Sequence, residues 1–162
     1  MTSLITSASC CATREIERIT LTSTNAEFAG GTFSTGQYEL FDIENVISVV
    51  PHQVTVPIIG AANSVRLKLR NGSTSLDRFD DGVRRYALSV QLKRSYIGDD
   101  VANYLYPSDM IPIWRASEPS RLGSLWQFAW ELQDGTPYGL TAPDEWSVEL
   151  FVIKKCPECL IE

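Results

Sequence analysis

Apolar and polar residues alternate with a period of two along much of the chain, which is the pattern of half-buried β-strands. The clearest case is residues 64–70, where three apolar residues alternate with three cations. Further strands are predicted over residues 85–95, 125–132 and 146–153. The last of these is apolar on both faces in its second half, so we expect it in the centre of a sheet.

Shorter strands are predicted over four more segments, residues 16–22, 37–43, 54–59 and 111–115. Pro51 and Pro57 have no N–H to donate. The segment between them is therefore not expected to be a fully paired central strand, and the two prolines should blunt a sheet edge. One short helix is predicted over residues 99–106, because Pro107 would end it.

About eight strands separated by turn residues indicate an all-β fold, a two-sheet antiparallel β-sandwich with a jelly-roll or Greek-key path and at most one short helix. The 162 residues suffice for one such domain. We expect an N-terminal arm at residues 1–14, the sandwich at residues 15–154 and a C-terminal tail at residues 155–162. The connections at residues 71–84 and 133–145 are long enough to carry binding or assembly roles.

Residues suited to catalysis are sparse in this sequence. His52 is the single histidine, lies in a segment flanked by prolines, and has no G-x-S-x-G motif to accompany it. Glu131 and Glu149 lie on two predicted strands and offer an acid pair of the kind found in sandwich glycosidases. We expect instead that both glutamates are solvent-facing side chains of amphipathic strands. We expect no enzymatic activity and no cofactor.

The four cysteines lie near the two ends of the chain, as Cys10-Cys11 and as the C-x-x-C motif of Cys156 and Cys159. Free thiols, disulfides within or between chains, and a zinc site all remain open. A disulfide could tie the termini together or bridge subunits, and no bound zinc is expected. The acidic loop at residues 77–82 lacks the spacing of a calcium loop, so we expect a turn held by Asx-type hydrogen bonds.

The charges are unevenly distributed along the chain. Residues 64–95 hold eight cations and three acids, a net charge of +5, against −11 for the other residues. The candidate contact residues of this basic segment are Arg66, Lys68, Arg70, Arg84, Arg85 and Lys93. Such a row of cations can be a solvated sheet face, can contact nucleic-acid phosphates, or can dock on the acidic surface of another copy.

The aromatic residues divide into core and contact candidates. Trp126 and Trp130 alternate with small or polar residues, which is typical of a core face, whereas a sugar-stacking platform would need the tryptophans exposed. Tyr138 lies in a Gly- and Pro-rich loop and is predicted to be an exposed contact residue. The sequence Asn71-Gly72-Ser73 has the form of a glycosylation site, and a turn is expected there.

Elimination leads to a hypothesis for the function. The chain has no apolar run long enough to span a membrane. We expect no secretory signal, because no basic residue precedes the first apolar residues of the sequence. The leading hypothesis is a non-enzymatic structural protein that assembles with copies of itself or with other structural subunits, such as a capsid or other virion component. It would be located in the virion or the cytoplasm. The alternative is a carbohydrate-binding, lectin-like module.

Overall fold

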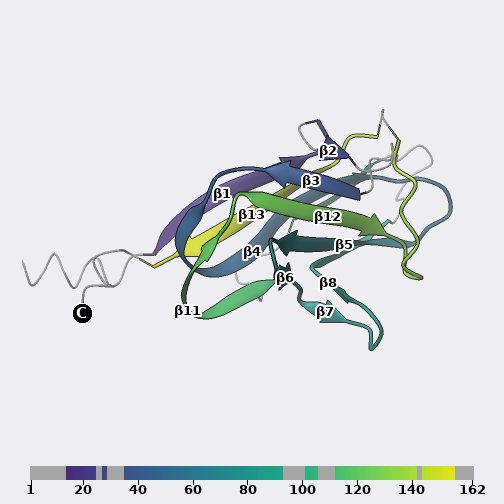
Figure 1. The fold of residues 1–162 in the computed structure, drawn as a ribbon. Coiled ribbons are helices and arrows are strands. Elements are labelled where there is room, and N and C mark those ends of the chain that lie inside the picture. The colour runs from purple at the N-terminus through teal and green to yellow at the C-terminus, as the bar shows by residue number, and fades with distance from the viewer. Residues whose placement is uncertain are drawn as a thin grey trace, which may run out of the picture.

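The computed structural model describes residues 14–24, 27–28, 35–92, 101–105, 112–141 and 144–155. These residues form two large antiparallel sheets and one small hairpin, with no helix among them. The sheets lie one behind the other, so that β3, β12 and β5 stand in front of β1, β13 and β4 (Figure 1). The predicted all-β, two-sheet antiparallel sandwich is confirmed. The jelly-roll path and the three segment boundaries stay predictions.

The first sheet, called sheet A, is built around the longest strand of the described chain. Its strands are β1 (Glu15–Thr22), β13 (Ser147–Lys154), β4 (Ile43–Pro57), β10 (Val101–Leu105) and β11 (Trp114–Leu122). The strand β13 pairs with β1 on one side and with β4 on the other, so it is central as predicted. The other edge of β4 is shared by β10 and β11.

The second sheet, called sheet B, repeats this plan around β5. Its strands are β2 (Glu27–Phe28), β3 (Thr35–Glu39), β12 (Leu125–Glu131), β5 (Ser64–Asn71), β6 (Thr74–Leu76) and β9 (Leu88–Gln91). One edge of β5 pairs with β12, and the other is shared by β6 and β9. The small hairpin of β7 (Phe79–Asp80) and β8 (Arg85–Tyr86) projects beside this sheet (Figure 1).

Aromatic side chains fill the space between the sheets. Trp126, Phe128 and Trp130 alternate along β12 and are all buried. They meet Trp146, which directly precedes β13 of the opposite sheet. The Trp146 ring packs edge-on at 4.8 Å from Phe128 and 5.7 Å from Trp130, measured between ring centroids. The prediction of a core face on β12 is therefore confirmed.

The prediction for the proline-flanked segment is wrong, because β4 runs through Pro51 as a central strand. Glu149 pairs with Gln53, while the next residue of β13, Leu150, pairs with Pro51, so His52 is an extra residue in a bulge. A bulge interrupts the ladder locally, which lets a residue without an N–H lie inside a sheet. Pro57 is the last residue of β4, so its missing N–H does not interrupt the hydrogen bonds within the strand.

The helix predicted over residues 99–106 is also wrong. Residues 101–105 form β10, which pairs antiparallel with β4 from Gln53 to Pro57. A segment of five residues has weak intrinsic preferences, and pairing with an open strand edge decides its conformation. The connection over residues 71–84 is also more structured than expected, because it contains β6 and β7.

The predicted turn at Asn71-Gly72-Ser73 is confirmed. Gly72 has a φ of 58°, as the first central residue of a two-residue hairpin turn requires. The Asn71 side chain is buried and donates from Nδ2 to the carbonyl of Gly123, while its Oδ1 accepts from the Gly123 N–H, both at 2.8 Å. This asparagine therefore fastens the β5–β6 turn to the loop before β12.

Trp146→Ala is expected to lower the free energy of unfolding by about 3–5 kcal/mol, because it removes the ring between the two sheets and leaves a cavity. Urea unfolding followed by far-UV circular dichroism measures this change. Trp114→Ala is the matched control, since Trp114 is only partly buried at the margin of the core. Equal losses in both variants would contradict the central role of Trp146.

Candidate assembly surfaces

The outer face of sheet B carries the cations predicted on residues 64–70. Val65, Leu67 and Leu69 are buried, so the alternate residues Arg66, Lys68 and Arg70 point away from the core. The alternation read from the sequence is confirmed for this strand. The two strands beside β5, β12 and β9, place further polar side chains on the same face.

The Arg66 side chain is held by contacts with other residues of the same chain. Its guanidinium forms an ion pair with Asp81 and lies 4.3 Å from the ring centroid of Tyr86. Only 15% of the Arg66 side chain is exposed. Because Asp81 and Tyr86 belong to the region of the β7–β8 hairpin, Arg66 holds that hairpin against sheet B.

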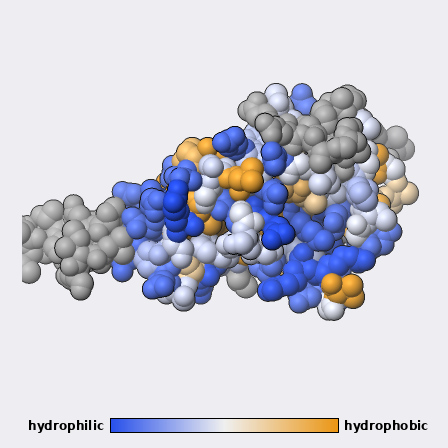
Figure 2. Space-filling view, in the orientation of Figure 1, coloured by the Kyte–Doolittle hydropathy of each residue, from blue (hydrophilic) through white to orange (hydrophobic). Residues whose placement is uncertain are grey.

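The other candidate cations are mostly paired as well. Lys68 lies 3.2 Å from a carboxylate oxygen of Glu131 on β12, and Arg85 lies 2.8 Å from Asp77. Arg70 is exposed. Lys93 lies outside the described residues. Hydrophilic residues cover most of this side, and the hydrophobic groups on it are small and separate (Figure 2). The positive charge expected here is therefore largely compensated, and a contact role for these residues stays a prediction.

The loop between β7 and β8 is a turn held by carboxylates, as predicted. Oδ1 of Asp81 accepts the N–H groups of Val83 and Arg84 at 2.9 and 2.7 Å, and Asp80 accepts the N–H of Gly82 at 2.7 Å. The N–H of Arg84 and then the guanidinium of Arg66 lower the pKa of Asp81 from 3.8 to about 2. Arg84 itself reaches the next loop and donates to the carbonyl of Gln133 at 3.2 Å.

The outer face of sheet A has a different character. Ile19 and Leu21 of β1 are buried, so Ile16 and Arg18 point outward, opposite Ile153 and Phe151 of β13. Ile16 is 64% exposed, while Phe151 and Ile153 are partly exposed. We give the name sheet A patch to six of the outward residues on these strands and β4: Ile16, Arg18, His52, Glu149, Phe151 and Ile153.

Charged groups surround the Phe151 ring within this patch. His52 stacks on the ring with centroids 4.4 Å apart, and the Arg18 guanidinium lies 5.6 Å from the ring centroid. The same Glu149 oxygen lies 3.4 Å from Nε of Arg18 and 3.5 Å from Nε2 of His52. His52 is part of strand β4. The patch combines an apolar centre with both signs of charge at its margin.

The structure does not bring Glu131 and Glu149 together as an acid pair. Glu131 lies on β12 of sheet B and pairs with Lys68, whereas Glu149 lies on β13 of sheet A. Both alternate with buried neighbours, so they point away from the core on opposite sides of the sandwich. Two carboxylates so placed cannot act on one glycosidic bond.

Two predictions on aromatic residues are settled by burial. Trp126, Trp130 and Trp146 are each at most 2% exposed, so they cannot form a sugar-stacking platform. Tyr138 is wrongly predicted as exposed, since it is 2% exposed. Its hydroxyl donates to the carbonyl of Pro57 and accepts the N–H of Ile59, both at 2.7 Å. A loop tyrosine can be core when its hydroxyl satisfies main-chain groups at the end of a strand.

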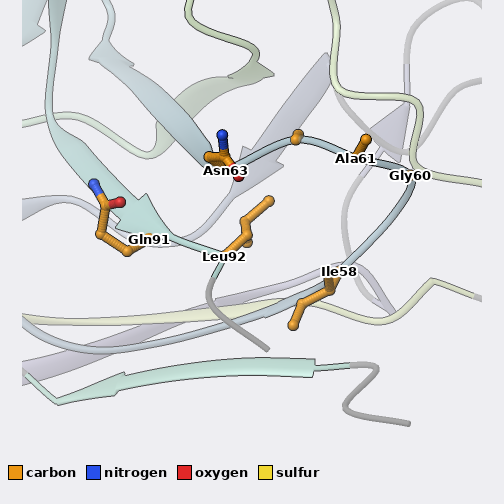
Figure 3. Close-up of a pocket in the computed structure, with 7 residues that line it drawn as sticks. Ile58, Gly60, Ala61, Asn63, Gln91 and Leu92 are labelled. Atoms are coloured by element: carbon orange, nitrogen blue, oxygen red, sulfur yellow. The ribbon is translucent and has the colours of Figure 1, made fainter. Parts of the chain in front are cut away.

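A cavity of about 610 Å³ lies between the loop after β4 and the end of β9 (Figure 3). Its lining residues are Ile58, Gly60, Ala61, Ala62, Asn63, Gln91 and Leu92. This lining contains no acid, base or nucleophile, so it offers binding surface and no catalytic group. Within the described residues, no group of three or more His, Cys, Asp or Glu side chains is placed to hold a metal ion.

The cysteine predictions fall outside the described residues, which include neither Cys10 and Cys11 nor Cys156 and Cys159. Their redox state therefore stays a prediction.

The described part of the chain contains no helix that is long and apolar enough to cross a membrane.

No protein-family model and no curated protein matches the chain. Among solved structures, the chain is similar to VP2 in the infectious bursal disease virus subviral particle, with 13% identity, a TM-score of 0.40 and coverage of 93% of this chain and 35% of that one. It is also similar to the virus-like particle of Macrobrachium rosenbergii extra small virus, with 12% identity, a TM-score of 0.25 and coverage of 86% and 79%. The chain spans about a third of the length of the VP2 chain and of the two other infectious bursal virus chains it matches.

The paired Asp81 makes a testable contribution to acid stability. Its lowered pKa stabilises the folded protein above the unfolded value of 3.8, and this contribution is lost as the pH falls toward 2. In Asp81→Asn the midpoint of urea unfolding should therefore be lower at pH 5 and should fall less between pH 5 and pH 2.5 than in the parent protein.

Asp80→Asn is the matched control, because it removes the same charge from the same hairpin without touching the ion pair to Arg66. Its urea midpoint should keep the parent's fall between pH 5 and pH 2.5. If Asp81→Asn showed the parent's pH dependence unchanged, the role assigned to the Asp81 carboxylate would be wrong.

Proposed function

We propose that this protein is a non-enzymatic structural protein that assembles with copies of itself, as a capsid or other virion component located in the virion or the host cytoplasm. The observation that carries the proposal is the sheet A patch. The solvent face of an antiparallel sheet is ordinarily polar, but here Ile16, Phe151 and Ile153 line it together. An apolar centre with a charged margin is the usual composition of a protein–protein contact.

The free energy gained by burying this patch alone is too small for a stable contact, so the contact should cover a larger area. Burying one such side chain contributes about 1.5–3 kcal/mol, while association costs several kcal/mol in lost freedom of motion. A stable contact covers roughly 800 Å² on each partner, more than three side chains supply. Other exposed apolar residues lie on different elements and extend the available area: Phe41, Val101 and Leu125.

Contact points on several sides suit a closed shell better than a simple dimer. A closed shell of one chain requires each subunit to use more than one surface, because every copy meets several neighbours, whereas a twofold dimer needs a single patch. The two signs of charge on the sheet A patch would orient neighbours, and salt would weaken this orientation. Arg70, on the outer face of sheet B, offers a further positive charge that could contact the acidic surface of a neighbouring copy. Nucleic acid is the second kind of partner proposed for that face.

The test is the solution mass of the full chain, measured by light scattering after size exclusion at low and high salt, with and without reductant. We expect a species much larger than one chain at low salt, dissociating as salt rises. Ile16→Asp should raise the dissociation constant by about tenfold or more, because it places a charge in the apolar centre of the contact.

Val83→Asp is the matched control, since Val83 is 79% exposed at the hairpin turn and remote in sequence from the sheet A patch. Far-UV circular dichroism confirms that both variants remain folded. A monomer under every condition, or equal dissociation by both substitutions, would contradict assembly through the sheet A patch.

A further inference from the structure

The strand β1 lies at one side of sheet A and has an open edge. Its eight residues pair with β13 without a bulge, and no strand among the described residues pairs with its other side. The strand contains no proline. Natural sheets commonly protect such an edge with a proline, a bulge or a charge, because unpaired N–H and C=O groups bind further strands. The edge of β1 has neither a proline nor a bulge.

The register shows which main-chain groups point outward from this edge. Ser23 comes one step beyond the last ladder pair of β1, and its N–H donates to the Trp146 carbonyl at 3.0 Å. Because main-chain groups alternate between the two sides of a strand, the odd-numbered residues of β1 direct theirs toward β13. The even-numbered residues direct theirs away from it. In agreement, the N–H of Thr22 donates at 3.2 Å to the Tyr38 hydroxyl of sheet B.

Three residues form the open part of the edge: Ile16, Arg18 and Thr20. Within the described chain, their N–H and C=O groups have no hydrogen-bond partner. The three residues are spaced evenly about Arg18, so the edge can pair with a copy of itself. A twofold axis at Arg18 sets Ile16 opposite Thr20 of the second copy and Arg18 opposite Arg18. Every N–H of the open edge then meets a C=O of the other copy.

The side chains of the edge are compatible with this pairing. Like charges that lie directly opposite destabilise an antiparallel pair, so Arg18 needs compensation. Its guanidinium leans back over β13, where Nε lies 3.4 Å from Glu149 and the guanidinium carbon lies 5.6 Å from the ring centroid of Phe151. Each copy therefore brings one cation and one carboxylate to the axis, and their charges balance. Ile16, which is 64% exposed, would lie opposite the methyl group of Thr20.

We propose that β1 pairs antiparallel with β1 of a second copy across a twofold axis at Arg18, which joins sheet A of both copies into one continuous sheet. This proposal rests on the proposed function and gives the geometry of one of its contacts. Antiparallel pairing of two identical edges keeps the same face of both sheets on one side. The two sheet A patches would therefore lie next to each other around the axis.

A second copy suits this edge better than an unrelated extended peptide. Any extended peptide can pair with an open strand edge through its main chain. The even spacing about Arg18 and the balance of Arg18 with Glu149 are features that only self-pairing uses. A self-complementary contact of this kind closes after two chains, so it would be one of the several contacts that a shell requires.

Thr20→Pro tests the pairing, because it removes an N–H that points outward and leaves the hydrogen bonds to β13 in place. Thr20→Val is the matched control, since it also removes the hydroxyl but keeps the N–H. Light scattering of the full chain at low salt over a dilution series measures the dissociation constant of the two-chain contact. We expect it to rise about tenfold or more in Thr20→Pro and less than about twofold in Thr20→Val. Far-UV circular dichroism verifies that both variants are folded.

Amide hydrogen exchange of the parent protein gives a second measurement that needs no substitution. The amides of Ile16, Arg18 and Thr20 should exchange about tenfold or more slowly in the concentrated low-salt sample than in the dilute one. The amides of Glu17 and Ile19 face β13 and should be slow in both samples. Mass spectrometry with electron-transfer fragmentation resolves the individual amides. If Thr20→Pro does not fold, this measurement decides.

The outcomes separate this proposal from the proposed function. A large assembly with fast exchange at the open edge, or with a dissociation constant unchanged by a folded Thr20→Pro, would overturn the edge pairing and leave assembly through the sheet A patch standing. A species of two chains that Thr20→Pro dissociates would support the edge pairing and contradict a closed shell. Slow exchange at the open edge in the dilute monomer would overturn the pairing, because another part of the same chain would then occupy the edge. A monomer under every condition would overturn both proposals.

Discussion

The contact of Trp146 with Phe128 and Trp130 is the interaction on which the sandwich depends. Trp146 belongs to the chain entering sheet A, and the other two rings belong to β12 of sheet B. Ser23 fixes the tryptophan in place, because Ser23 N–H donates to the Trp146 carbonyl and the Trp146 N–H donates to the Ser23 hydroxyl, both at 3.0 Å. The start of β13 and the end of β1 are thereby joined where the two sheets meet.

The pocket beside the end of β9 has no acid, base or nucleophile in its lining. The two outer faces of the sandwich differ in what their charged side chains do. On sheet B, Arg66 and Lys68 use their charge to hold Asp81 and Glu131. Such exposed or half-exposed pairs stabilise the fold modestly and leave little charge for a partner.

The sequence alone predicts the structural features that neighbouring residues determine. It does not predict the features that depend on contacts between residues far apart in the sequence. Alternation alone predicts the buried faces of β5 and β12, because side chains of a strand point to alternate sides. It cannot show that a bulge at His52 admits Pro51 to a central strand, or that residues 101–105 pair with β4. The compensation of Arg66 by Asp81 is equally hidden, since it follows from the position of a hairpin fifteen residues away.

The sheet A patch differs from the outer face of sheet B because its charged side chains surround apolar ones. Arg18 and His52 both contact Glu149, so the Glu149 carboxylate is already partnered within this patch, as Asp81 and Glu131 are on sheet B. The difference is the apolar strip that they enclose, and Ile16 remains 64% exposed within it. Charged side chains that are already held in position lose less conformational freedom when a neighbouring subunit binds. Burial of the apolar side chains then provides the favourable free energy. This combination is the reason why we propose that association uses sheet A and not the cation row of sheet B.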